Sequence, residues 1–247
     1  MKMDYNDTIG TGCDGAESLG EGLRRNMEAS AAFVRKVKEE VPGIVLENCA
    51  SGGSKMEPLM MRLCSMASFS DAHECQEIPL IAAALHRAIL PAQSQIWAVI
   101  RETDSLKRIA YSIAASFLGR LCLSGDVRNL TEEQWKVIDD GIAFYREIAP
   151  LIRDGATEFF GTEQGSWRHP KGWQGILRTA GKEGFAVFHT FGGAVDRGPY
   201  VKLSGEKDVE ILSAYSDEEP VFEIRDGKLF WNCCENWKAA AVHFRIQ

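Results

Sequence analysis

Residues 44–53 read Ile44-Val45-Leu46-Glu47-Asn48-Cys49-Ala50-Ser51-Gly52-Gly53. The first residues form a short apolar run, which is typical of a parallel strand that is covered on both faces. Two glycines follow just past its carboxyl end, where the absence of a Cβ lets the backbone approach a ligand closely. In α/β folds, ligands bind at this end of the strands. The alternative is an ordinary exit from a strand into a loop, and these ten residues alone leave both interpretations open.

The neighbouring sequence indicates a parallel sheet. Residues 1–6 have strand character, Thr8–Gly15 is a glycine-rich loop, and an amphipathic helix is predicted from about Ala16 to Glu40. Pro42-Gly43 ends this helix, and the strand 44–49 follows at once. Strand, helix, strand is the crossover unit of parallel sheets.

Helices and strands continue to alternate up to about residue 155. The expected elements are a helix over Pro58–Cys64, a strand over Ser65–Ser70, a helix over 78–90, a strand or continued helix over Gln95–Arg101, a helix over Ser105–Leu118 and a strand over Gly119–Ser124. A capping box at Thr131–Gln134 opens a further helix. We expect this helix to end near Ile148, because Pro150 follows it.

Past Gly155 the hydrophobic pattern changes to the alternation of β-strands. Strands are predicted over Thr157–Phe160, Gly175–Thr179, Phe185–His189, Tyr200–Lys202, Glu210–Leu212, Val221–Arg225, Lys228–Trp231 and Ala240–Arg245. Turn signals such as Asp226-Gly227 separate them. The prediction is therefore an α/β domain at residues 1–155, followed by an all-β domain at residues 156–247 that is an antiparallel sandwich or half-barrel.

Composition excludes several classes of function. The 247 residues include 45% hydrophobic and 26% charged residues, which is typical of a globular protein. A net charge of −7 argues against nucleic acid or an anionic membrane as partner, because both favour a basic surface. The seven cysteines form no CxxC pair and the histidines match no ligand spacing, so no metal site is predicted. A reduced, cytoplasmic location is the simplest interpretation.

Two aspartates each follow a short strand of the first domain. If the strands are parallel, Asp4 and Asp71 lie at the same end of the sheet. Most glycoside hydrolases use two carboxyl groups that flank the glycosidic bond. Lys2 shares a face with Asp4, and a nearby cation favours the ionised carboxylate that a nucleophile needs. Asp71 has fewer obvious cations nearby, which suits the group that must hold a proton. The alternative role for each aspartate is a helix N-cap.

Three motifs carry a resemblance to a known family. In chain order, Lys2-Met3-Asp4-Tyr5, Glu47–Gly53 and Ser70-Asp71 resemble the family 36 glycoside hydrolases, which are α-galactosidases of bacterial and plant type. The helix from Leu130 to Arg146 also resembles the last barrel helix of that family. The resemblance covers essentially the whole chain but only the carboxyl-terminal part of a typical member.

The resemblance implies a retaining α-galactosidase on a (β/α)8 barrel, with no cofactor and an α-galactoside oligosaccharide as substrate. It implies Asp4 as nucleophile and Asp71 as acid/base, with Lys2 on the sugar hydroxyls and with Cys49 and Gly52 near the 2-hydroxyl.

Two further residues are candidates from their positions. Asn48 ends the strand at the site and could hydrogen-bond either the sugar or the loop. His73 lies beside the expected acid/base and could shape the leaving-group subsite, or it could be a polar loop residue.

The chain departs from the family pattern in two ways. Glu74 stands where the family usually carries a second aspartate after the acid/base, which puts the leaving-group side in doubt. The earlier barrel strands, which supply further sugar contacts, are absent from these residues. A complete barrel has eight strand–helix units, and a partial one leaves open sheet edges. We therefore expect a second chain or a second copy to complete the barrel.

Other functions stay open. A family relative could act on α-N-acetylgalactosaminides or transfer galactosyl groups, although Cys49 with Gly52 implies a plain 2-hydroxyl. The chain could also be a truncated, non-catalytic fragment that binds sugar or a partner.

Overall fold

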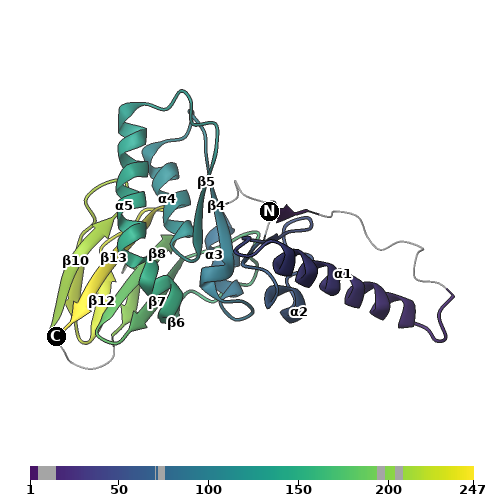
Figure 1. Ribbon diagram of the computed structural model, residues 1–247. Coiled ribbons are helices and arrows are strands. Elements are labelled where there is room, and N and C mark those ends of the chain that lie inside the picture. The colour runs from purple at the N-terminus through teal and green to yellow at the C-terminus, as the bar shows by residue number, and fades with distance from the viewer. Residues whose placement is uncertain (5–14, 70, 72–75, 194–197, 204–207) are drawn as a thin grey trace. The chain divides into compact units, whose positions relative to one another are not determined.

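The computed structural model describes residues 1–4, 15–69, 71, 76–193, 198–203 and 208–247 (Figure 1). By internal contacts the chain divides into two compact units, Met1–Asp71 and Ala72–Gln247. This division differs from the predicted domain boundary at residue 155. The predicted boundary nevertheless coincides with a change of architecture, because helix α5 ends at Asp154 and antiparallel strands begin at Ala156. The assignment of 1–155 and 156–247 as domains stays a prediction.

The first unit is a short parallel sheet with connecting helices. Its elements in chain order are β1 (Lys2–Met3), α1 (Glu21–Glu40), β2 (Glu47–Asn48), α2 (Pro58–Met61) and β3 (Met66–Ser68). β2 pairs in parallel with β1 on one side and with β3 on the other. The predicted order of strand, helix and strand is therefore confirmed. The core of this unit joins α1 to the sheet through Met3, Ala31, Val34, Leu46, Leu63 and Cys64.

Several elements of the first unit are shorter than predicted. The helix begins at Glu21 rather than near Ala16, after Gly20, whose φ of 84° is left-handed and interrupts helical geometry. β2 ends at Asn48, because the chain takes positive φ values from Ala50 onward and an extended strand cannot continue through them.

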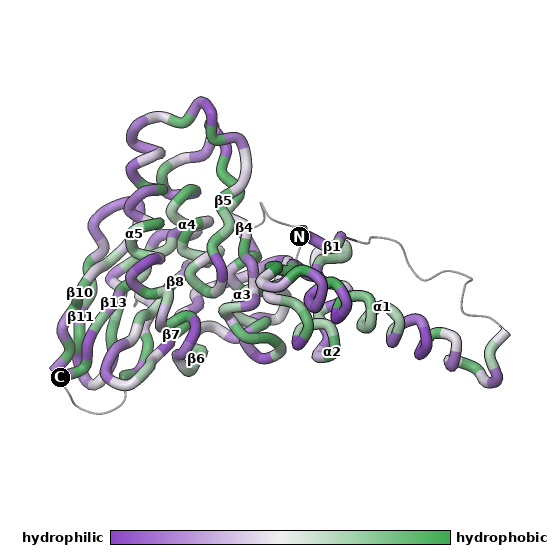
Figure 2. The backbone as a smooth tube through the Cα atoms, viewed as in Figure 1, coloured by the Kyte–Doolittle hydropathy of each residue, from purple (hydrophilic) through white to green (hydrophobic). Residues whose placement is uncertain are grey.

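The second unit begins with two parallel strands and their helices. The elements are α3 (Ile78–Leu85), a 3-10 turn at Pro91–Gln93, β4 (Ser94–Ile100), α4 (Leu106–Ser116), β5 (Arg120–Gly125) and α5 (Glu132–Asp154). β4 and β5 pair in parallel over six residue pairs, which shows that the segment predicted as a strand or a continued helix over Gln95–Arg101 is a strand that ends at Ile100. α3 is shorter than the predicted helix over 78–90. Figure 2 shows its apolar character, which contrasts with the mixed colouring along α1.

All eight predicted strands after Gly155 are present, and their pairing is antiparallel. They are β6 (Ala156–Gly161), β7 (Trp173–Ala180), β8 (Glu183–Thr190), β9 (Tyr200–Lys202), β10 (Val209–Tyr215), β11 (Phe222–Arg225), β12 (Lys228–Trp231) and β13 (Ala239–Ile246). One sheet has the order β10-β13-β8-β7-β6 and the other β11-β12-β9. Side chains of both sheets, including Phe188, Trp231 and Phe244, share one buried core. This is the packing of a sandwich.

The predicted end of α5 near Ile148 is wrong, because the helix continues through Pro150 to Asp154. Proline removes one helical hydrogen bond, but Leu151 and Ile152 are buried beyond it and hold the last turn in place. Arg178 on β7 then caps the helix. Its Nε donates to the carbonyl of Leu151 (3.1 Å) and its Nη2 to that of Ile152 (2.9 Å), while Nη2 also donates to the carbonyl of Gly155. A cation at these carbonyls also complements the helix dipole.

Two histidines, one half-buried and one fully buried, join elements of the second unit. His86 is half-buried and contacts the Leu118 carbonyl through Nε2 and the Thr157 hydroxyl through Nδ1. His189 is fully buried on β8, with Nε2 3.3 Å from the Tyr111 carbonyl. Burial lowers the pKa of His86 to about 4 and that of His189 to about 3. Both side chains are therefore neutral near pH 7.

Candidate functional site

The candidate site lies in the first unit, at the carboxyl ends of its parallel strands. Asp4 directly follows β1, and Asp71 lies three residues after the end of β3. Because parallel strands present their carboxyl ends at one edge of the sheet, both carboxylates belong to the same edge. Both residues are exposed.

Lys2 connects the acidic groups at this edge. Its Nζ lies 3.7 Å from Asp4 Oδ2 and 3.7 Å from Glu47 Oε1, and it hydrogen-bonds the Cys49 thiol. Partial burial lowers the pKa of Lys2, but its contacts with Cys49, Glu47 and Asp4 raise it by more, so that the net shift is upward. The ammonium therefore stays charged at neutral pH. An ammonium beside a carboxylate stabilises the anion, which is the form that acts as a nucleophile.

Glu47 belongs to the same cluster, although sequence reasoning assigned it no role. It pairs in register with Lys2 across β1 and β2, and only 8% of its surface is exposed. Ser68 on β3 donates its hydroxyl to Glu47 Oε1 at 2.5 Å. Strand alternation could have found Glu47, because it is two residues from Cys49 and thus shares its face.

Asn48 is placed on the other face of β2. Its Nδ2 donates to the Lys55 carbonyl at 2.7 Å and lies 3.9 Å from Met61 Sδ, and the residue is 1% exposed. This geometry supports the loop-anchoring alternative for Asn48 rather than a contact with the sugar.

The loop after β2 has an unusual backbone. Ala50, Ser51, Gly52 and Gly53 have φ values of 93°, 46°, 68° and 110°. A Cβ on Gly53 would lie 2.5 Å from Met56 Cε and 3.1 Å from the Phe69 carbonyl oxygen, so that glycine is required here. Left-handed conformations at Ala50 and Ser51 are costly, and such strain is concentrated at functional sites. The roles of Cys49 and Gly52 near a sugar stay predictions.

The leaving-group side of the site is described only in part. Asp71 is placed, whereas Ser70, His73 and Glu74 lie outside the described residues. The expectations for His73 and Glu74 therefore remain predictions.

The described part of the chain has neither a metal-binding cluster nor a membrane-spanning helix. No group of three or more histidine, cysteine, aspartate or glutamate side chains could hold a metal ion there. No helix in that part of the chain is both long enough and apolar enough to cross a membrane.

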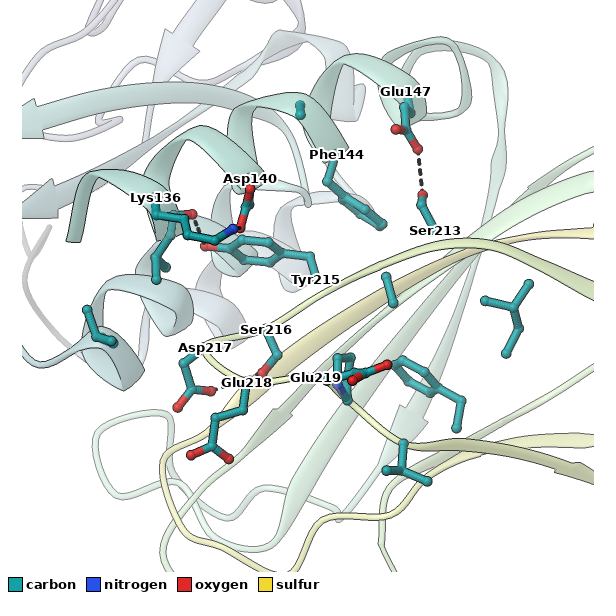
Figure 3. Close-up of a pocket in the computed structure, with 18 of the residues that line it drawn as sticks. Lys136, Asp140, Phe144, Glu147, Ser213, Tyr215, Ser216, Asp217, Glu218 and Glu219 are labelled. Carbon is teal, nitrogen blue, oxygen red and sulfur yellow. Dashed lines mark hydrogen bonds and ion pairs between the residues drawn. The ribbon is translucent and has the colours of Figure 1, made fainter. Parts of the chain in front are cut away.

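A separate cleft of about 1090 Å³ lies within the second unit, between α5 and the segment from β10 to Phe222 (Figure 3). Its floor includes Phe144 and Tyr215, whose hydroxyl donates to the Val137 carbonyl at 3.1 Å. Carboxylates outnumber cations on its walls, which include Glu133, Asp140, Glu147, Asp217, Glu218, Glu219 and Lys136. The cleft therefore disfavours an anionic ligand. Sequence reasoning did not identify it.

Comparison with solved structures finds the same fold in part of the family 36 α-galactosidases. A variant of such an enzyme from Geobacillus stearothermophilus, in complex with raffinose, matches with a TM-score of 0.76 and 17% identity, covering 100% of this chain and 35% of that one. A variant from the same organism in complex with stachyose gives a TM-score of 0.72 and 17% identity, with coverages of 100% and 35%. The α-galactosidase from Lactobacillus brevis gives 0.69 and 16%, with coverages of 93% and 33%.

The chain therefore spans about a third of the length of the structures it matches. At these identities the likeness is one of fold. The resemblance to family 36 is confirmed at that level, as is the predicted order of a partial, barrel-like parallel α/β sheet followed by antiparallel sheets. No protein-family model matches the sequence, and no curated protein is significantly similar to it.

Proposed function

We propose that this chain provides the catalytic acids of a retaining α-galactosidase. The observation that carries the proposal is the position of Asp4 and Asp71 at one edge of a parallel sheet, with the Lys2 ammonium 3.7 Å from Asp4. The fold likeness to family 36 α-galactosidases supports the same reaction class.

In the proposed reaction, a carboxylate oxygen of Asp4 attacks the anomeric carbon while the glycosidic bond breaks. Asp71 transfers its proton to the departing oxygen, which leaves as an alcohol. Asp71 then removes a proton from water, and the water oxygen displaces Asp4 from the anomeric carbon. Two inversions give net retention, for which the carboxyl groups should stand about 5 Å apart around the bound sugar.

The proposed substrates are α-galactosides of the raffinose type. Structures with this fold have been solved in complex with raffinose and stachyose. Cys49 lies on the same strand face as Glu47 and interacts with Lys2, which supports a role for its thiol at the site. A side chain there suits a plain 2-hydroxyl better than the bulkier 2-acetamido group. We further propose a reducing, cytoplasmic location, which fits the free thiols of Cys49 and Cys64.

The test of the function is a panel of p-nitrophenyl glycosides. We expect turnover of the α-galactoside, at least 100-fold slower turnover of the α-N-acetylgalactosaminide, and none of the β-galactoside. The product anomer, followed by NMR at early times, should be α. Binding of galactose without turnover of any of these glycosides would instead favour a sugar-binding fragment, and a β product would contradict the retaining mechanism.

We propose in addition that a further polypeptide segment packs on α1 and extends the sheet at β1. The apolar face of α1 supports this: only Ala31 and Val34 are buried on the helix, whereas Leu23 and Met27 are 43% exposed and Phe33 is 52% exposed. Met27 and Phe33 line a groove of about 640 Å³, together with other residues of α1, Met3, Asn48 and the segment from Ser54 to Met60. A parallel strand beside β1, with an amphipathic helix in the groove, would bury these side chains. Such a strand–helix unit is what completes a barrel, and it could come from a second chain or a second copy.

The 247-residue chain by itself is therefore expected to associate in solution or to hydrolyse galactosides slowly. Replacement of Phe33 by Glu places a charge in the groove and should shift the association equilibrium at least tenfold toward the monomer, as measured by sedimentation. Val221→Glu is the matched control, because Val221 is 61% exposed but lies in the second unit. A monodisperse wild-type monomer with a kcat typical of glycosidases would refute the proposal of a completing segment.

A further inference from the structure

We infer that Glu47 is a positioning residue for Lys2, and that Ser68 in turn holds Glu47. The inference deepens the proposed function and rests on it for its catalytic consequence. Its structural part, the restraint of the Lys2 ammonium, can be tested without any turnover.

The three residues form one line across three neighbouring strands. Lys2 on β1 pairs in register with Glu47 on β2, and Glu47 pairs in register with Met66 on β3, two residues before Ser68. A single carboxylate oxygen, Glu47 Oε1, accepts the Ser68 hydroxyl at 2.5 Å and lies 3.7 Å from Lys2 Nζ. On its other side, the Lys2 ammonium lies 3.7 Å from Asp4 Oδ2. The line therefore runs from a buried hydroxyl to the proposed nucleophile.

Burial distinguishes the two carboxylates that share Lys2. The side chain of Glu47 is 11% exposed, whereas that of Asp4 is 41% exposed. A buried carboxylate is tolerated only when it is paired and hydrogen-bonded, and Lys2 and Ser68 meet both requirements for Glu47. Glu47 is thus held in place by its two partners, whereas Asp4 is accessible from solvent, where a ligand can reach it.

The Lys2 ammonium therefore interacts with two carboxylates at once, those of Glu47 and Asp4. A lysine side chain is flexible, and with Asp4 as its only acidic neighbour it would be free to close onto the nucleophile. Glu47 draws the ammonium back along the sheet. Lys2 then stays beside Asp4 while leaving a carboxylate oxygen and an ammonium hydrogen available to the sugar. Misplacement of a reacting group by about 1 Å can cost about 100-fold in rate.

The experiment replaces Glu47 by Gln in the 247-residue chain and measures two quantities. The first is the rate at which an acylating reagent modifies Lys2 at pH 8.5, read by peptide mass spectrometry against Lys36 as an internal reference. We expect about a 3- to 10-fold increase, because loss of the ion pair lowers the pKa of Lys2 and frees the amine. The second is kcat/KM on p-nitrophenyl α-galactoside, which should fall about 10- to 100-fold.

Matched variants separate positioning from folding. Ser68→Ala should change the Lys2 acylation rate and kcat/KM in the same directions as Glu47→Gln, but by smaller factors. Ser68→Thr keeps the hydroxyl and should have wild-type values of both. Glu28→Gln removes an exposed carboxylate that pairs with Arg24 on α1, and it should change neither quantity. If Glu47→Gln does not fold, as judged by circular dichroism, the serine pair carries the test.

The outcomes differ for the two proposals. Unchanged Lys2 reactivity in Glu47→Gln and Ser68→Ala overturns the positioning role, whatever the activity. Raised reactivity with unchanged kcat/KM also overturns it. If the variants raise the reactivity of Lys2 but the wild-type protein hydrolyses no galactoside, the result supports the Glu47–Lys2 restraint and overturns the proposed function instead.

Discussion

Replacement of Asp4 by Asn should lower kcat on p-nitrophenyl α-galactoside by about 10⁴-fold or more, because the amide cannot form the glycosyl ester on which double displacement depends. The change keeps the size of the side chain and its exposed position after β1, so that folding should be unaffected. In the wild-type protein, a slow galactosyl substrate should add the mass of one sugar to the peptide that contains Asp4. The same peptide from the variant should stay unlabelled.

A control variant and a variant of the proposed acid/base test the specificity of this result. Asp140→Asn removes an exposed carboxylate paired with Lys136 on α5 and should leave kcat unchanged. Asp71→Asn should slow substrates with poor leaving groups far more than p-nitrophenyl substrates, because the phenolate departs without a proton. Activity of Asp4→Asn within tenfold of wild type would remove Asp4 from the mechanism and with it the retaining assignment.

Mild acid should destabilise the second unit. His86 and His189 have pKa values of about 4 and 3 in the folded protein, below the value of about 6.5 for an unfolded histidine. Below pH 6.5 the unfolded chain therefore binds more protons than the folded one, so this contribution to stability is complete above pH 6.5 and is lost as the pH falls toward 4. At pH 5 each histidine should cost about 2 kcal/mol, or about 4 kcal/mol together.

The measurement is urea unfolding at pH 7.5 and pH 5, followed by tryptophan fluorescence. All six tryptophans lie at or beyond residue 97, so that fluorescence reports the second unit. His86→Gln should roughly halve the loss of stability between the two pH values, because one of the two titrating groups is gone. His169→Gln changes an exposed histidine and should leave the difference intact. Equal free energies of unfolding at pH 7.5 and 5 would contradict the neutral state of both histidines in the folded protein.

Local sequence patterns were sufficient for the type and order of most elements. Period-2 alternation located all eight antiparallel strands, and the capping box located the start of α5 at Thr131. These signals depend on residues close together in the chain, such as the Thr131 hydroxyl that accepts from the Gln134 amide at 3.2 Å. The strand–helix–strand order likewise predicted the parallel pairing of β1 and β2.

Long-range contacts explain where the predictions failed. Pro150 is a local signal to end a helix, yet α5 continues because Arg178, 27 residues beyond Leu151, binds the final carbonyls. The apolar stripe of α1 predicts burial from its spacing, but burial needs a packing partner, and Leu23 and Met27 find none among the described residues of the first unit.

The residues of the candidate site also fall into those that local sequence identifies and those that only long-range contacts identify. Asp4 and Asp71 could be named because each follows a strand whose end the pattern marks, and Lys2 because it shares a face with Asp4. Strand alternation puts Glu47 on the same face as Cys49, but its role follows only from the strand pairing that sets it against Lys2 and Ser68. Asn48 received two possible roles for the same reason, and its contacts with Lys55 and Met61 on the opposite face favour one of them. Residue order specifies which side chains follow each strand, whereas the pairing of strands distant in sequence specifies which of those side chains meet.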